Sequence, residues 1–220
     1  MTLDSCGLIT TGVDLLGDIL MTTVAQMAPT DRRSEAASRA SLFKLIFDRS
    51  FQEGEFTLSS GRSSNMYFNM KPTMMLPEGA YLAAEALMEI ANDLGSEYVG
   101  GLEMGAVPVI GSMAAISWDK GNEIRTIFVR KAPKQHGTRN RIEGLAPGES
   151  LRKKCVLIID DVATSGASIL KAVEAVREMD GIVDHAACLV NRQEGADAFL
   201  RERGVKLHSV FCAEEFLNRR

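Results

Sequence analysis

Residues 156–168 read Val156-Leu157-Ile158-Ile159-Asp160-Asp161-Val162-Ala163-Thr164-Ser165-Gly166-Ala167-Ser168. Four apolar residues predict a buried strand, and two adjacent carboxylates follow at its carboxyl end. The small residues after them allow backbone N–H groups to close around a phosphate at the positive amino-terminal end of a helix. The plainer alternative is a capped helix that follows a strand with incidental acidic residues.

The rest of the chain places this stretch in an alternating pattern of strands and helices. We expect strands at 98–102, 125–130, 155–159, 185–191 and 205–211, and helices at 79–94, 107–118, 168–179 and 196–204. Such alternation predicts an α/β fold with a parallel sheet and right-handed crossovers. Ligands of these folds bind beyond the carboxyl ends of the strands, where Asp160 and Asp161 are expected to lie.

The amino-terminal part is less regular. Residues 1–38 form a weakly ordered extension in this interpretation, and residues 39–220 form the folded domain. An apolar stripe at helical spacing begins near Ser41. A polar, glycine-rich segment follows at 53–69, with β-type alternation at 56–58.

Composition limits the class of protein. The chain has 220 residues, 45% of them hydrophobic, with 25 basic and 29 acidic side chains. The net charge of −4 argues against nucleic acid as the main partner. We find no apolar run long enough for a membrane and no signal peptide. The four cysteines lack a CxxC pair, which favours reduced core cysteines and a cytoplasmic location.

A second motif concentrates positive charge in this acidic chain. Arg130, Lys131, Lys134 and His136 fall within seven residues, and Pro133 and Gly137 argue against a helix. The polar loop, from residue 131 to 150, is longer than most connections, which is typical of a functional lid. Several cations placed on a leaving pyrophosphate would stabilise its growing charge. The alternative is a solvated basic loop.

Both motifs carry a resemblance to a known family. Residues 156–168 resemble the phosphoribosyl-pyrophosphate signature of type I phosphoribosyltransferases, and the basic loop looks like the mobile loop of the orotate phosphoribosyltransferases. The resemblance implies a central, mostly parallel sheet flanked by helices, with a small hood formed mainly by 41–75 and the carboxyl-terminal segment. It also implies a cytoplasmic homodimer, in which the basic loop of one subunit reaches the site of the other.

The resemblance assigns a role to each part of the two motifs. The phosphoribosyl-pyrophosphate site would comprise Arg130, Lys131, Lys134, His136 and the run Asp160, Asp161, Val162, Ala163, Thr164, Ser165, Gly166, Ala167 and Ser168. Lys134, His136, Asp160 and Asp161 would be catalytic. Mg²⁺ would be held through pyrophosphate and ribose hydroxyls near the two aspartates, with no protein ligand directly assigned.

The resemblance also implies which residues would bind the nucleobase. Residues 56–69 resemble the amino-terminal motif of the same family, in which Tyr67 and Phe68 would lie against orotate. Arg192 and Thr164 would complete the orotate site by the same resemblance. Taken without the family, Arg192 could equally be a surface arginine in an ion pair.

Two positions depart from the family pattern. Ser59 and Gly105 stand where many members carry lysines, and Lys71 or the backbone amides of 103–106 are possible substitutes. The implied reaction converts orotate and phosphoribosyl pyrophosphate into orotidine 5′-monophosphate and pyrophosphate. A transferase for another nucleobase and a non-catalytic sensor of phosphoribosyl pyrophosphate remain as alternatives.

Overall fold

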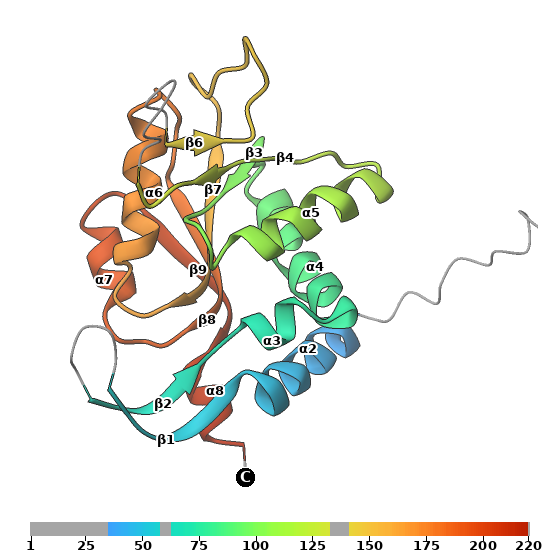
Figure 1. Ribbon diagram of the computed structural model, residues 1–220, viewed down its shortest axis with the longest axis vertical. Helices are drawn as coiled ribbons and strands as arrows, with labels where there is room; N and C mark the ends of the chain where they lie inside the picture. Colours follow the sequence, from blue (N-terminus) through green and yellow to red (C-terminus); the bar gives the residue numbers. More distant parts are fainter. Residues whose placement is uncertain (1–34, 58–62, 133–140, 220) are drawn as a thin grey trace, which may run out of the picture. The chain divides into compact units, whose positions relative to one another are not determined.

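The central element is a sheet of five strands with the order β4-β3-β7-β8-β9 (Figure 1). A computed structural model describes residues 35–57, 63–132 and 141–219. Every neighbouring pair of strands in this sheet is parallel. The strands are β3 (Tyr98–Gly100), β4 (Arg125–Thr126), β7 (Val156–Ala163), β8 (His185–Asn191) and β9 (Lys206–Cys212). The predicted parallel α/β sheet is therefore confirmed.

Helices cover both faces of the sheet (Figure 1). Leu157 and Ile159 of β7 face a core shared with α4 (Pro77–Asp93) and α5 (Val107–Asp119). Val156 and Ile158 face a second core shared with α6 (Ala167–Arg177), while Leu200 brings in α7 (Ala196–Arg201). This alternation follows from the two-residue period of a strand, and it explains why the first four residues of β7, 156–159, are all apolar.

A second group of elements forms the hood that the resemblance implied. It comprises α2 (Glu35–Arg49), the antiparallel hairpin of β1 (Phe51–Thr57) and β2 (Ser63–Phe68), α3 (Lys71–Met74) and α8 (Ala213–Leu217). Aromatic rings join these elements: the ring centroids of Phe43 and Phe216 lie 4.4 Å apart, and those of Phe51 and Phe68 lie 5.0 Å apart. Burial of such rings fixes the hairpin against the carboxyl-terminal helix.

Residues 1–34 of the expected extension, 1–38, lie outside the described part, so the predicted extension stays a prediction. The described residues begin with helix α2 at Glu35. Contacts divide the chain into two units, Met1–Ala37 and Ser38–Arg220. The expected strand at 125–130 forms two short pieces, β4 and β5 (Phe128–Val129), and β5 also pairs antiparallel with β6 (Ile142–Glu143). The parallel pairing continues past β4, because the Val129 backbone N–H donates to the Gly101 carbonyl oxygen at 2.8 Å and the Val129 carbonyl oxygen accepts the Glu103 N–H at 2.9 Å.

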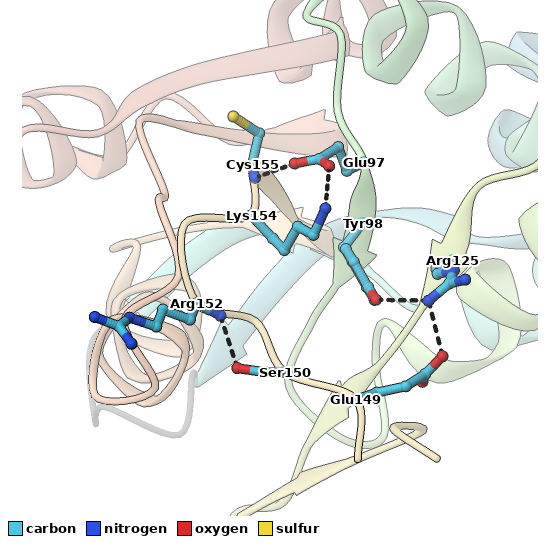
Figure 2. Close-up of polar contacts among 8 residues, drawn as sticks. All are labelled: Glu97, Tyr98, Arg125, Glu149, Ser150, Arg152, Lys154 and Cys155. Carbon is cyan, nitrogen blue, oxygen red and sulfur yellow. Dashed lines mark hydrogen bonds and ion pairs between the residues drawn. The ribbon is translucent and has the colours of Figure 1, made fainter. Parts of the chain in front are cut away.

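The amino-terminal ends of the strands are tied together by polar contacts (Figure 2). The Glu97 carboxylate pairs with Lys154 at 2.7 Å and accepts the Cys155 backbone N–H at 3.0 Å. The hydrogen bond from Lys154, followed by that from the Cys155 backbone, lowers the pKa of Glu97. Cys155 is exposed, so the expectation of a core cysteine fails for it, whereas it holds for the buried Cys188.

A neighbouring contact fixes the entry to β4 (Figure 2). Arg125 donates to the Tyr98 hydroxyl at 3.1 Å and pairs with Glu149 at 2.8 Å. Tyr98 itself is buried. These contacts lie at the opposite ends of the strands from Asp160 and Asp161, so we assign them to the framework and not to chemistry.

Two histidines on adjacent strands predict a pH dependence of stability. His208 Nε2 lies 3.2 Å from His185 Nδ1. Burial, followed by the charges of His185 and Lys206, lowers the pKa of His208. The unfolded chain then binds more protons, so the free energy of unfolding falls as pH drops below about 6.5. Between pH ~7.5 and ~5.5, wild type should lose more stability in urea titrations than His208→Gln; equal losses would show that His208 does not contribute.

Candidate active site

Strand β7 carries the two carboxylates into the site. The sequence predicted the two carboxylates after the end of the strand. The strand instead continues to Ala163, so Asp160 and Asp161 lie within it. Asp160 is buried, and its Oδ1 accepts the backbone N–H of Asp161 at 3.0 Å. The Oδ1 atom of Asp161 accepts the backbone N–H of Val162 at 2.9 Å. Both side chains are thereby held at the edge where ligands of parallel sheets bind.

The adjacent carboxylates of Asp160 and Asp161 favour a bound partner of opposite charge. Burial raises the pKa of Asp160 well above its usual range, and the adjacent charge of Asp161 raises it further. The charge of Lys131 acts in the opposite direction. Two carboxylates in such surroundings are stabilised by a cation or by hydroxyl donors of a ligand. Hard carboxylate oxygens are also the donors that Mg²⁺ prefers.

The loop between β3 and α5 packs directly on these carboxylates. A Cβ atom at Gly105 would lie 2.8 Å from Asp161 Oδ1 and 3.2 Å from Asp160 Oδ1. The peptide bond between Glu103 and Met104 in this loop is cis. Glycine at 105, one of the two departures from the family pattern, thus lets the loop backbone approach the carboxylates more closely than any side chain would allow.

This contact gives a testable expectation for Gly105→Ala. The added methyl group must displace the Asp161 carboxylate, so we expect KM for phosphoribosyl pyrophosphate to rise about tenfold, which corresponds to ~1.4 kcal/mol. Steady-state kinetics would measure it. Gly111→Ala is the matched control, because a Cβ there meets nothing within 4 Å. Equal KM values for phosphoribosyl pyrophosphate in the two variants would show that the close approach at Gly105 does not affect binding of this substrate.

The start of α6 has the geometry expected of a phosphate-binding turn. Gly166 adopts a φ of 80°, and no side chain caps the helix that follows. A Cβ at this position would also lie 3.1 Å from Leu200. Ser165, Ala167 and Ser168 are exposed and Thr164 is half-buried, so this turn presents small residues and a helix amino terminus to a ligand.

The stem of the basic loop is anchored next to the carboxylates. Arg130 pairs with Glu143 at 3.5 Å and donates its backbone N–H to the Arg141 carbonyl oxygen at 2.8 Å. The Lys131 backbone N–H donates to Glu103 Oε1 at 2.8 Å, which ties the loop to the β3–α5 connection. Lys134 and His136 lie outside the described residues, so their expected role stays a prediction.

Arg192 is buried, which excludes the alternative of a surface arginine. Its side chain is 4% exposed and pairs with Glu194 at 2.6 Å. The backbone N–H of Arg192 donates to the Ala163 carbonyl oxygen at 2.9 Å, so the residue is joined to the end of β7. The structure thereby brings the predicted orotate-binding arginine next to the predicted phosphate loop.

The two aromatic residues of the nucleobase motif face opposite ways. Tyr67 is 40% exposed and its ring lies 5.4 Å from that of Phe56. Phe68 is buried among the hood rings, next to Phe51 and Phe216. Successive side chains of a strand point to opposite faces, so the Phe68 side chain belongs to the core. Only its backbone remains available to a ligand.

Sequence reasoning missed three contributors to this site. Ser64 and Glu194 contact the Arg192 guanidinium, and Glu103 binds the stem of the basic loop. Glu194 could have been suspected from its position two residues after Arg192. Lys71, considered as a substitute cation, is exposed at the start of α3.

The described ranges contain neither a cluster of metal ligands nor a helix suited to cross a membrane. Within residues 35–57, 63–132 and 141–219, no cluster of three or more histidine, cysteine, aspartate or glutamate side chains could hold a metal ion. Over the same ranges, no helix combines the length and apolar character that a membrane crossing requires.

The five-stranded parallel sheet flanked by helices, with the carboxylate pair on β7, has the architecture of the type I phosphoribosyltransferases. Residues 77–203 match the family described as Phosphoribosyl transferase domain. The chain is 51% identical over 186 residues to the orotate phosphoribosyltransferase of Rhodopseudomonas palustris (strain BisB5), covering 84% of this chain and 100% of that protein. This chain belongs to the orotate phosphoribosyltransferase family.

Solved structures agree with this assignment. The orotate phosphoribosyltransferase of Mycobacterium tuberculosis H37Rv, in complex with Fe(III) dicitrate, superposes with a TM-score of 0.70 at 31% identity over 81% of this chain and 98% of that chain. The same enzyme in complex with 5-phospho-alpha-D-ribosyl 1-diphosphate gives a TM-score of 0.66 at 30% identity, with the same coverage.

Proposed function

We propose that this chain transfers the phosphoribosyl group of phosphoribosyl pyrophosphate to orotate, forming orotidine 5′-monophosphate and pyrophosphate in pyrimidine biosynthesis. The observation that carries the proposal is the contact between the predicted orotate site and the predicted phosphoribosyl site. A buried arginine suited to an anionic base is hydrogen-bonded through its backbone to the strand that carries the carboxylate pair. The relatives named above act as support, because their names state this activity.

The phosphoribosyl group would bind along β7 and the start of α6. Residues 164–168 would hold its 5′-phosphate through backbone N–H groups and hydroxyls. Asp160 and Asp161 would accept hydrogen bonds from the ribose hydroxyls, and Mg²⁺ would be held near them through pyrophosphate and these hydroxyls. When bound, Mg²⁺ screens the charge between pyrophosphate and the carboxylates.

The leaving pyrophosphate would face the basic loop. Arg130 and Lys131 would line this side, and Lys134 and His136 would supply cations and donors where negative charge grows in the transition state. We assign the latter two to the neighbouring subunit's site, so the active form would be a homodimer in the cytoplasm. Neither nucleic acid nor a membrane has a part in this scheme.

Orotate would lie between the hood and the start of α6. The Arg192 guanidinium would bind the anionic base, with Thr164, Tyr67 and the backbone of Phe68 around the ring. Positive charge develops on the ribose as pyrophosphate leaves, and a ring nitrogen of orotate attacks from the opposite face. This substitution requires no side-chain nucleophile, so the residues act by positioning and by charge.

Loss of orotate absorbance in the ultraviolet tests the proposal. We expect consumption only when phosphoribosyl pyrophosphate and Mg²⁺ are both present. Omission of either component is the internal control. Robust turnover of adenine, hypoxanthine or uracil with orotate inert would support a transferase for another base. Binding of phosphoribosyl pyrophosphate without turnover of any base would support the sensor.

A further inference from the structure

The guanidinium of Arg192 is held by acceptors on two separate segments. Its Nη2 atom lies 2.7 Å from Ser64 Oγ, 3.4 Å from the Met66 carbonyl oxygen and 2.6 Å from Glu194 Oε1. Ser64 and Arg192 are 128 positions apart along the chain. The contact therefore joins strand β2 of the hood to the segment that follows β8.

The Ser64 hydroxyl has its full set of hydrogen bonds. It donates to the Met66 carbonyl oxygen at 2.9 Å and accepts the Met66 backbone N–H at 3.2 Å. Its remaining lone pair faces Arg192 Nη2. A hydroxyl has one donor and two acceptor positions, so this geometry directs it to serve as an acceptor for the arginine.

The Nε atom of Arg192 stands apart from these contacts. It is buried and has no hydrogen-bond partner within the part of the chain that the structure describes. A buried, charged donor without a partner is unfavourable, so such a donor points to a ligand group. Three acceptors lie within hydrogen-bond distance of Nη2. These acceptors orient the guanidinium, and they therefore also determine where the Nε N–H points.

We propose that Ser64 is a positioning residue for the nucleobase, which acts by fixing the Arg192 guanidinium so that its Nε N–H meets an oxygen of orotate. This inference rests on the proposed function. Glu194 balances the arginine charge, and the neutral Ser64 contributes geometry. Without the hydroxyl, the guanidinium keeps its charge and its pair with Glu194 but loses the contact that links it to the hood.

Ser64→Ala tests this role through the two substrates. We expect KM for orotate to rise about tenfold, because a hydrogen bond to a charged group is lost, while KM for phosphoribosyl pyrophosphate stays within about twofold. Ser64→Thr, which keeps the hydroxyl, should restore most of the orotate affinity. Ser63→Ala, an exposed neighbour on the same strand, is the matched control. Should Ser64→Ala fail to fold, Ser64→Val and Ser64→Thr provide a pair of similar shape that differ in the hydroxyl.

A double-mutant cycle with Arg192→Ala separates positioning from general support of the fold. In the Arg192→Ala background, Ser64→Ala should cause no further rise in KM for orotate. Independent effects that multiply in the double variant, or equal losses for both substrates, would overturn the proposal. If wild type turns over orotate and Ser64→Ala matches it, this inference alone fails. If wild type leaves orotate unchanged, the proposed function fails.

Discussion

Arg192→Ala is expected to weaken orotate binding by about 2–5 kcal/mol, which is the largest single effect that we predict. The side chain is 4% exposed, so a contact with an anionic base would be shielded from water. The variant removes a charged donor from a buried position. Calorimetric titration with orotate and, separately, with phosphoribosyl pyrophosphate would measure the two affinities.

The two titrations distinguish a binding residue from a structural one. Binding of phosphoribosyl pyrophosphate should change much less, because Arg192 contacts β7 through its backbone N–H and this bond survives the substitution. Glu194 is 25% exposed and can be hydrated when its partner is lost. Arg192→Lys keeps the charge without the planar fork and should recover only part of the affinity. Equal losses for both substrates would mean that Arg192 only supports the fold.

Mixing Lys134→Ala with Asp161→Asn is expected to restore activity that each variant lacks. Lys134→Ala should lose roughly 3 kcal/mol of transition-state stabilisation, or about 10²-fold in rate, and Asp161→Asn should be impaired through the ribose and metal contacts. In a mixed dimer, one site would combine an intact carboxylate pair with an intact lysine from the other subunit. The second site would carry both substitutions.

The expected recovery is about half of a wild-type dimer for each mixed dimer formed, if the two sites are independent. Turnover would be measured after subunit exchange, with mass spectrometry to quantify mixed dimers. Each variant mixed with itself is the control. Mixed dimers without activity would show that the basic loop closes over its own subunit.

Strong periodicity made most of the sheet and its helices predictable. The runs at 156–159 and 186–190 are apolar on both faces because helices cover both sides, and such runs stand out in a sequence. Strand β8 was predicted with both boundaries correct, from His185 to Asn191. Helix α4 begins two residues before the predicted start, at Pro77, which suits the first turn of a helix.

Short or tertiary features could not be predicted in this way. Strands β5 and β6 have two residues each, so they have no period, and their pairing depends on a return of the chain. The continuation of β7 through Asp160 and Asp161 runs against the low strand propensity of aspartate and is imposed by pairing with β8. Helix α8 has five residues and is held by the hood core.

The candidate site, like the fold, was predictable from the sequence only in part. The carboxylates and the predicted phosphate-binding turn lie in one continuous motif, so their proximity follows from the sequence. The environment of Arg192 depends on Ser64, which is distant in the chain, and no local pattern reveals that contact. Tyr67 and Phe68 were expected together because they are adjacent, but alternation along β2 separates their side chains.

Identification of the products tests the central claim most directly. Purified protein would be incubated with orotate, phosphoribosyl pyrophosphate and Mg²⁺, and the products would be quantified by liquid chromatography and mass spectrometry. We expect orotidine 5′-monophosphate and pyrophosphate in equal amounts, matching the orotate consumed. Orotate recovered unchanged, while adenine, hypoxanthine or uracil is converted to its nucleotide under the same conditions, would contradict the account.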